Sequence, residues 1–175
     1  MSDSTKGDRI SQIRDAVTLR PATDADYDFL RRLYHSTRAE EMKRFPFTEE
    51  QKVAFLDQQF AAQYEYYLQH YPTCERNLIV VGDDLAGRLW TDEWRDQIRM
   101  VDIALMPEWR GRGLGESLVR DVLARGEKAG KPVTIHVEAF NPALRMYERL
   151  GFQKVDTNGV YYLMKWTPSQ ANAAS

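Results

Sequence analysis

The glycine-rich stretch at residues 106–118, MPEWRGRGLGESL, constrains this chain more than any other part of its sequence. Glycines occupy three alternate positions in it, Gly111, Gly113 and Gly115, and arginines stand between them. An apolar run, VDIAL, precedes the stretch, and apolar residues at helical spacing follow it from Leu114 onward. The sequence therefore predicts a strand that passes through a flexible, basic turn directly into a helix.

A turn of this kind suits a phosphate group. The first N–H groups of a helix have no partner within the helix, and the helix dipole adds partial positive charge at that end. Glycines let an anion approach the backbone closely, and Arg110 and Arg112 can add charge-assisted hydrogen bonds. We interpret the stretch as a phosphate or pyrophosphate site; the alternative is a tight loop that only caps the helix.

Two familiar phosphate motifs do not fit. A Walker A loop needs Lys-Ser or Lys-Thr after its last glycine, but Glu116 and Ser117 follow Gly115. The dinucleotide fingerprint GxGxxG needs a glycine where Glu116 stands, and it belongs to the first unit of a doubly wound sheet. This argues against a nicotinamide-dependent reductase. The pattern that remains is Arg-x-x-Gly-x-Gly.

Periodicity and turn signals predict the remaining elements. Strands are expected at 17–20, 77–81, 85–91, 98–106, 133–137, 152–155 and 160–166, and helices at 24–42, 48–68, 114–130 and 142–150. The order of elements is thus β-α-α-β-β-β-α-β-α-β-β. A capping box, TEEQ, marks the start of the second helix.

Composition limits the class of protein. The length of 175 residues suits one domain, which we place at 17–167, with flexible ends at 1–16 and 168–175. A net charge of −2 gives no general attraction to nucleic acid or to an anionic membrane. A single cysteine, Cys74, excludes a disulfide within the chain and a thiolate zinc site, and we expect no metal. The chain shows neither a membrane span nor a signal peptide, so we expect a cytoplasmic protein.

The glycine-rich stretch and the later segment HVEAFNPALRMYERLGF, at residues 136–152, together resemble the GNAT superfamily of N-acetyltransferases. The resemblance implies an α+β fold. Its central sheet is mixed but mostly antiparallel and has about seven strands, with about four helices around it. A V-shaped splay is expected between the fourth and fifth strands. The implied activity is acetyl transfer from acetyl-CoA to a primary amine, by direct attack in a ternary complex.

The resemblance also assigns the cofactor-binding residues. The loop residues would hold the pyrophosphate of coenzyme A: Arg110, Gly111, Arg112, Gly113, Leu114, Gly115 and Glu116. The pantetheine arm would lie in the splay and contact the backbone of Ile103, Leu105 and Met106. The N–H of Leu105 would polarise the thioester carbonyl. Asn141 matches an asparagine near the pantetheine, although a plain helix cap explains it equally well.

The candidate catalytic residues follow the same segment. Tyr147 matches a tyrosine that protonates the departing thiolate, but it stands one position closer to Asn141 than the family pattern usually has it. A core aromatic is the alternative, and Tyr161 and Tyr162 are weaker substitutes. The attacking amine must lose a proton, and a carboxylate or a histidine can accept it, directly or through water. Glu138 and His136, on one strand face, are favoured for this role.

Three expectations remain open. Asp102 is a third candidate base, or else it forms a salt bridge to a neighbouring strand. Acids beside aromatic residues would suit a cationic amine, which suggests an acceptor site; the alternative is a solvated turn with two half-buried tryptophans. These residues are His35, Glu40, Glu41, Phe45, Phe47, Trp90, Asp92, Glu93 and Trp94. The resemblance also suggests a homodimer through the hairpin at 152–166. The competing function is a coenzyme A-binding sensor or interaction domain without catalysis.

Overall fold

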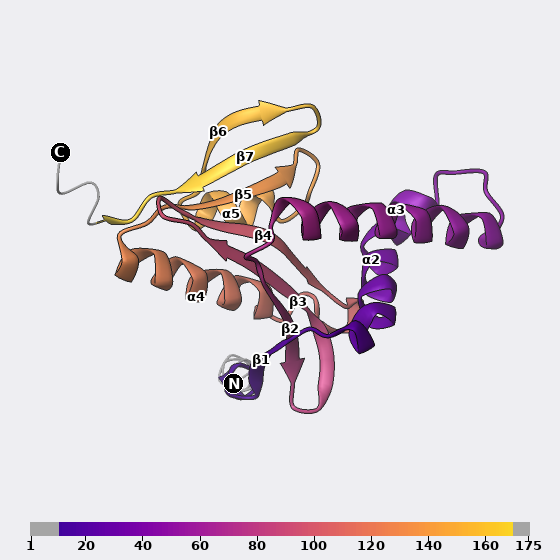
Figure 1. Cartoon of the computed structure of the whole chain (residues 1–175), viewed down its shortest axis with the longest axis horizontal. Coiled ribbons are helices and arrows are strands. Elements are labelled where there is room, and N and C mark those ends of the chain that lie inside the picture. Colours follow the sequence, from indigo (N-terminus) through magenta and orange to yellow (C-terminus); the bar gives the residue numbers. More distant parts are fainter. Residues whose placement is uncertain (1–10, 170–175) are drawn as a thin grey trace, which may run out of the picture.

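The computed structural model describes residues 11–169 of the chain. Seven strands form one sheet, in the order β1-β2-β3-β4-β5-β7-β6 (Figure 1). The strands are β1 (Val17–Pro21), β2 (Glu75–Val81), β3 (Asp84–Glu93), β4 (Ile98–Leu105), β5 (Val133–Glu138), β6 (Gln153–Asn158) and β7 (Tyr161–Trp166). All neighbouring pairs are antiparallel except β4 and β5, which run parallel. The mixed, mostly antiparallel sheet that the sequence predicts is confirmed.

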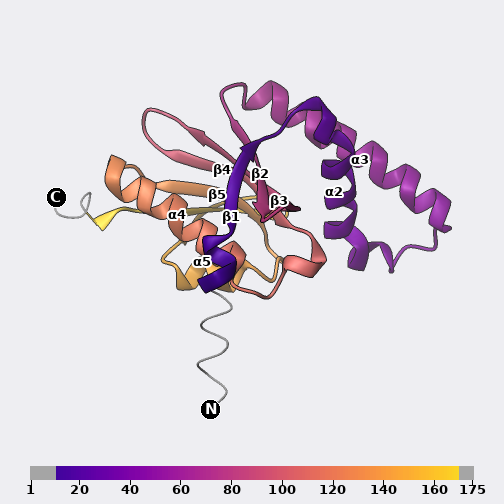
Figure 2. The same ribbon diagram turned by 90° about the horizontal axis from the view of Figure 1, so that it is seen from below.

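Helices cover both faces of this sheet. They are α2 (Tyr27–Met42), α3 (Glu49–His70), α4 (Leu114–Ala129) and α5 (Leu144–Arg149), with short 3-10 turns η1 (Asp24–Asp26) and η2 (Pro107–Trp109). Helices α4 and α5 lie on one face, and α2 and α3 lie on the other, as two views at right angles show (Figures 1 and 2). Within residues 11–169, no helix has both the length and the apolar character that crossing a lipid bilayer requires.

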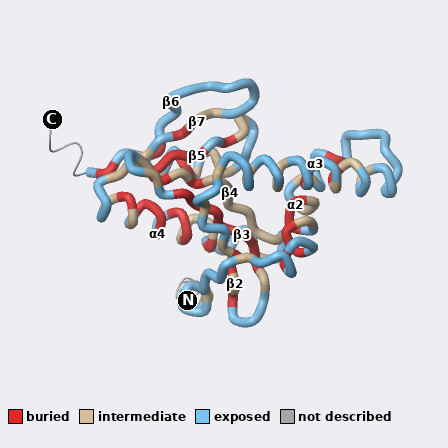
Figure 3. Tube along the Cα trace, in the orientation of Figure 1, coloured by how far each residue is buried: buried red, intermediate tan, exposed pale blue. Residues whose placement is uncertain are grey.

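Each face of the sheet has its own apolar core. On the α4 side, Val119 and Val122 are fully buried against the central strands. On the other side, Phe60 of α3 and Leu30 of α2 pack on Trp90 of β3. Buried segments therefore concentrate on α4 and the central strands, whereas β6 at the sheet edge is exposed (Figure 3). Each fully buried leucine or phenylalanine stabilises the fold by about 1.5–3 kcal/mol.

The helix ends follow local chemistry. The Thr48 hydroxyl accepts a hydrogen bond from the Gln51 N–H, and the Gln51 side chain accepts one from the Thr48 N–H, as the capping box predicts. Helix α5 is shorter than predicted, since it begins at Leu144 rather than at residue 142. The cause is Asn141, whose side-chain oxygen accepts from the Ala143 N–H and holds the intervening residues in a turn.

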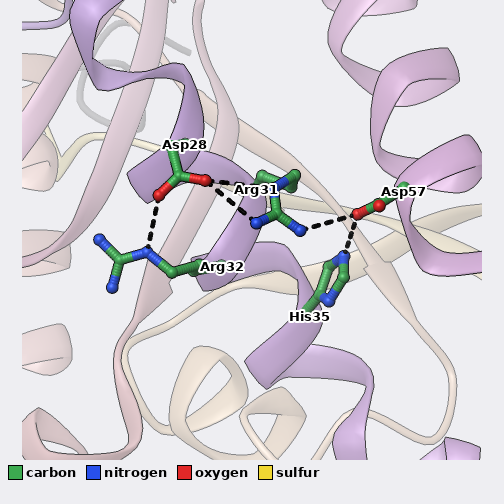
Figure 4. A network of polar contacts seen from close by, with 5 residues as sticks. All are labelled: Asp28, Arg31, Arg32, His35 and Asp57. Atoms are coloured by element: carbon green, nitrogen blue, oxygen red, sulfur yellow. Dashed lines mark hydrogen bonds and ion pairs between the residues drawn. The ribbon is translucent and has the colours of Figure 1, made fainter. Parts of the chain in front are cut away.

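Ion pairs fasten α2 to α3 (Figure 4). Asp57 of α3 lies 3.0 Å from Arg31 and 2.8 Å from the Nε2 of His35, both on α2. Asp28, one turn earlier in α2, binds Arg31 and Arg32. The Arg31 guanidinium holds the pKa of Asp57 below its usual range. The network keeps the two helices together where they extend beyond the sheet.

The structure describes part of both predicted ends. Residues 1–10 and 170–175 lie outside the described part, and residues 11–15 are helical. Ile13 packs against the α4-side core, and the Arg14 Nε donates to the Ser117 hydroxyl at 2.9 Å. At the other end, Ser169 hydrogen-bonds to Glu127. Tertiary contacts of this kind carry no local sequence signal, which is why the prediction missed them.

Gly87 of β3 offers a test of how closely β3 packs against β4. A Cβ atom added there would overlap the carbonyl oxygen of Ala104 on β4, so Gly87→Ala should force the two strands apart. We expect the free energy of unfolding to fall by about 2–3 kcal/mol, measured by denaturant titration. Gly115→Ala is the matched control, because its Cβ would meet only a leucine methyl 3.7 Å away. Equal stability of the two variants would contradict this account.

Candidate active site

The site is built around a gap between β4 and β5. Only Ile98–Met100 of β4 pair with residues 133–135 of β5, and beyond that point the two strands separate. Strand β4 stays paired with β3 as far as Leu105, and β5 stays paired with β7 as far as Glu138. Because each strand keeps its outer neighbour, their facing edges diverge. The V-shaped splay that the resemblance implied is confirmed.

A β-bulge in β4 redirects side chains at the point of separation. Trp90 of β3 pairs with Asp102 and Thr91 pairs with Met100, so Val101 is an extra residue between them. Met100 lies in the α4-side core, whereas Val101 packs with the α2–α3 core. The bulge therefore turns both Val101 and Asp102 toward the cavity under α2 and α3.

Successive backbone N–H groups of β4 point alternately toward β3 and toward the gap. The Met106 N–H donates to the Ala86 carbonyl at 2.8 Å, toward β3. Since N–H directions alternate along a strand, the N–H of Leu105 and that of Ile103 point toward the gap. The Met106 carbonyl also accepts from the Trp109 N–H, so both backbone groups of Met106 are engaged. Leu105 and Ile103 are therefore better placed than Met106 to contact a ligand in the gap.

The glycine-rich turn begins directly after this strand. Gly111 and Gly113 have φ angles of +71° and +79°, a left-handed conformation that side chains rarely adopt. Helix α4 then begins at Leu114, and the first helical hydrogen bond is donated by the Ser117 N–H. In the described part of the chain, the backbone N–H groups of residues 111–116 donate to no side chain and to no other backbone group. Unpaired N–H groups of this kind at the start of a helix are suited to an anion.

The two loop arginines behave differently. The Arg112 guanidinium is exposed and lies 5.0 Å from the centre of the Trp109 ring. Arg110 folds back instead: its Nε donates to the Leu105 carbonyl at 2.9 Å, and its Nη2 donates to the Ser36 hydroxyl at 3.1 Å. Arg110 thus connects the end of β4 to helix α2, and Arg112 is the freer of the two cations.

Glu116 places an acid in the first turn of α4. Its carboxylate lies 2.6 Å from Arg149 of α5 and 3.7 Å from Arg120. The hydrogen bond from Arg149 lowers the pKa of Glu116. These cations offset the negative charge beside the free N–H groups, so the end of the helix still suits an anion.

An inner cavity of about 210 Å³ lies at the mouth of the gap. It is lined from both sides by side chains of α2, α3, β3, β4, β5 and β7. Of the predicted site residues, Ile103, His136, Glu138, Asn141 and Tyr147 line it. The structure therefore brings the candidate catalytic residues together at one place, although they come from different elements.

Two ion pairs stand on either side of the inner cavity. Arg88 of β3, which is buried, pairs with Asp102 of β4, so the salt bridge to a neighbouring strand is confirmed for Asp102. The Gln63 side chain accepts from the same Arg88 Nη2 at 2.8 Å. Arg38 of α2 lies 3.0 Å from Glu138 of β5. Both carboxylates thus already have a cationic partner.

Tyr147 and His136 differ from these carboxylates. Tyr147 is buried and packs edge-on against Phe152, so it belongs to the core as well as to the cavity wall. Burial raises the pKa of Tyr147, which keeps its hydroxyl protonated. His136 has no ion-pair partner in the described part. Partial desolvation and the nearby Arg99 lower the pKa of His136, and Asp156 opposes this shift, although much of the residue is exposed; the neutral ring is therefore favoured.

The predicted acceptor residues lie elsewhere. None of them lines the inner cavity or the larger one beside it. Trp90 is buried in the core, Asp92 is buried and accepts from the Thr73 hydroxyl, and Phe45 and Phe47 stack on each other in the loop between α2 and α3. The alternation in β3 turns Trp90 toward Tyr64 and Tyr67 of α3 rather than toward the gap.

An outer cavity of about 530 Å³ adjoins the inner one. One wall, the α3 wall, is a stripe of α3 side chains at helical spacing, continued by the C-cap residue Tyr71, which the sequence analysis did not identify: Gln59, Ala62, Gln63, Tyr66, Tyr67 and Tyr71. The opposite wall includes His136 of β5 and the β6–β7 hairpin residues Asn158 and Tyr161. Both cavities share His136 and Tyr161, so the outer cavity adjoins the inner one along β5 and β7.

Comparisons with known proteins agree with this geometry. Residues 31–152 match the family model described as "Acetyltransferase (GNAT) family". The chain belongs to the GNAT acetyltransferase family. The structure resembles that of the PaiA N-acetyltransferase of Thermoplasma acidophilum in complex with coenzyme A. The TM-score is 0.66 at 15% identity, and the match covers 86% of this chain and 98% of that one.

Relatives by sequence match this GNAT chain only in part. The mycothiol acetyltransferase of Corynebacterium efficiens is 36% identical over 83 residues, which are 46% of this chain and 28% of that protein. The [ribosomal protein bS18]-alanine N-acetyltransferase of Haemophilus influenzae is 31% identical over 68 residues, 38% of this chain and 47% of that protein. This chain thus spans less than half the length of either relative.

The lowered pKa of His136 can be measured directly. We expect the His136 ring protons to titrate in NMR spectra with a midpoint below the ordinary histidine value of 6.5, because burial and Arg99 disfavour the imidazolium. The signal is assigned with His136→Gln, and the urea-unfolded chain supplies the reference midpoint. A midpoint in the folded protein at or above that reference would contradict the geometry around this ring.

Proposed function

We propose that the protein transfers the acetyl group of acetyl-CoA to a primary amine by direct attack in a ternary complex. The observation that carries the proposal is the gap between β4 and β5, which leads without interruption into the anion-binding turn before α4. A strand edge with free N–H groups suits an amide-containing arm, and the turn suits a diphosphate. Acetyl-CoA contains both groups, joined in that order.

The residues present fit this cosubstrate. The N–H groups of residues 111–116 and Arg112 would hold the diphosphate, and Asn141 at the cavity edge would face the pantetheine arm. The Leu105 N–H, which points into the gap, would donate to the thioester carbonyl oxygen as negative charge develops there. Arg110 fixes the position of that residue through its carbonyl.

Proton transfer on the acceptor side falls to His136. The amine must be neutral before its nitrogen attacks the carbonyl carbon, and a neutral imidazole can accept the proton, directly or through a water. Glu138 and Asp102 are each held by an arginine, whereas His136 is neutral and lines both cavities. We therefore favour His136 over Glu138, which keeps Arg38 and helix α2 in place.

Tyr147 supplies the proton on the other side of the reaction. When the tetrahedral intermediate collapses, the C–S bond breaks and the sulfur leaves with its electron pair as a thiolate. The Tyr147 hydroxyl, which stays protonated because it is buried, can donate to that sulfur. The products are the N-acetylated amine and coenzyme A, and no acyl-enzyme forms. The cycle closes when the proton on His136 passes to solvent and the Tyr147 phenolate takes a proton from solvent.

Turnover separates this proposal from a coenzyme A sensor. Purified protein is mixed with acetyl-CoA and a panel of primary amines, and thiol release is followed together with the mass of the acetylated product. We expect Tyr147→Phe to lower kcat about 100-fold, the usual contribution of a general acid, while acetyl-CoA affinity in calorimetry changes little. Acetyl-CoA binding without product from any amine would favour the sensor.

The diphosphate site is tested with a charge-matched pair of variants. Arg112→Ala should weaken acetyl-CoA binding about tenfold, since one charge-assisted hydrogen bond is worth about 1.5 kcal/mol. Arg125→Ala removes the same charge from α4 but far from the turn, where Arg125 faces Glu75, and should leave the affinity unchanged. Calorimetry measures both, with NADP as a ligand that should not bind. Equal effects of the two variants would argue against the assigned turn.

A further inference from the structure

The two cavities together contain no uncompensated charge. In the inner cavity, Arg88 is paired with Asp102 and Arg38 with Glu138. Arg38 also donates to Glu41 at 3.1 Å, on the side away from the gap. With His136 neutral, every charged side chain that lines either cavity in residues 11–169 is already matched by a partner of opposite sign.

The outer cavity is not apolar either. Its α3 wall presents two amides, Gln59 and Gln63, and three phenols, and its hairpin wall adds Asn158 and Tyr161. In that wall, the stripe of α3 side chains contains no lysine, arginine, aspartate or glutamate. Arg99 of β4 lines neither cavity; its guanidinium donates to the Tyr71 and Thr134 hydroxyls, and it forms no ion pair within residues 11–169. Amides and phenols donate and accept hydrogen bonds without net charge, and phenol rings stack on flat or hydroxylated groups.

We infer that the acceptor is a primary amine on an uncharged chain that carries amide or hydroxyl groups. Amines that also carry a second cation or an anion are excluded by the neutral lining of the two cavities. This rests on the proposed acetyl transfer. A further charge on the acceptor would be removed from water and would find no free counter-ion in the cavities. Amide or hydroxyl groups instead exchange their water for hydrogen bonds with the α3 stripe. The shared chemistry fits both a peptide amine and an amino sugar.

A series of three amines isolates the effect of charge. 5-Aminopentanol, 1,5-diaminopentane and 5-aminopentanoate have the same chain and the same reacting amine, and differ only in a terminal hydroxyl, ammonium or carboxylate. With saturating acetyl-CoA, we expect kcat/KM for the alcohol to exceed that of each charged homologue at least about tenfold. L-Alanyl-L-alaninamide and glucosamine are added to distinguish a peptide from a sugar as the source of the neutral chain.

Charge placed on the α3 stripe should reverse the selectivity. Gln59 lines the outer cavity, and its neighbour Gln58 is exposed but does not line it. Gln59→Glu should raise kcat/KM for 1,5-diaminopentane relative to 5-aminopentanol about fivefold, because an unpaired carboxylate then faces the second ammonium. Gln58→Glu adds the same charge one position around the helix and should leave that ratio unchanged.

The outcomes are distinct. Preference for the alcohol, together with a shift for Gln59→Glu only, supports the inference. Equal or better turnover of either charged homologue by the unaltered protein overturns the inference but leaves acetyl transfer established, and so does an equal shift in both variants. No acetylation of any of the five amines, with acetyl-CoA bound in calorimetry, overturns the proposed function and the inference with it.

Discussion

The divergence of β4 from β5 is the constraint on which the rest of the site depends. Each strand is already paired on its outer side, β4 with β3 and β5 with β7, and within residues 11–169 the Ile103 and Leu105 N–H groups on the facing edge of β4 have no protein partner. Such groups must bind water or a ligand that offers matching groups in an extended chain. The bulge at Val101 adds one residue to β4 where the strands part, and it turns Asp102 toward the cavity. One local irregularity therefore creates both the edge for the cosubstrate and the wall for the acceptor.

Charged side chains hold the walls of the gap together by binding partners within the protein, so their charges are not available to a substrate. Arg38 connects α2 to β5 through Glu138, and Arg110 connects the same helix to the end of β4 through Ser36. Helix α2 is thus fastened to both sides of the gap. Arg88 is buried, and removing its partner Asp102 would cost several kcal/mol, so this pair is not free to exchange its partner for a substrate. The cavities are neutral because their charged side chains are paired with one another. Amides and phenols are therefore the groups left to bind an acceptor.

The parts that could be predicted from the sequence are those with a local physical requirement. The glycine turn could be predicted because Gly111 and Gly113 adopt positive φ angles, which favour glycine. The capping box could be predicted because its hydrogen bonds join residues close in the sequence. The α3 wall of the outer cavity could not be predicted, because glutamines and tyrosines spaced four apart are also typical of a solvated helix face. The acids and aromatics at the end of β3 line neither cavity. Asp92 is satisfied by Thr73, nineteen positions away, and no local pattern indicates such a partner.

The spacing between Asn141 and Tyr147 shows how the fold absorbs a departure from the family pattern. Removing one residue from within a helix rotates everything beyond it by about 100°, which would carry Tyr147 away from the cavity. The structure avoids this because the change falls before the helix. Asn141 binds the Ala143 N–H, residues 142–143 stay in a turn, and α5 begins only at Leu144. Tyr147 is then held by its edge-on contact with Phe152 rather than by its distance from Asn141. The tyrosine keeps its place in the cavity wall, and Asn141 both ends the turn and faces the gap.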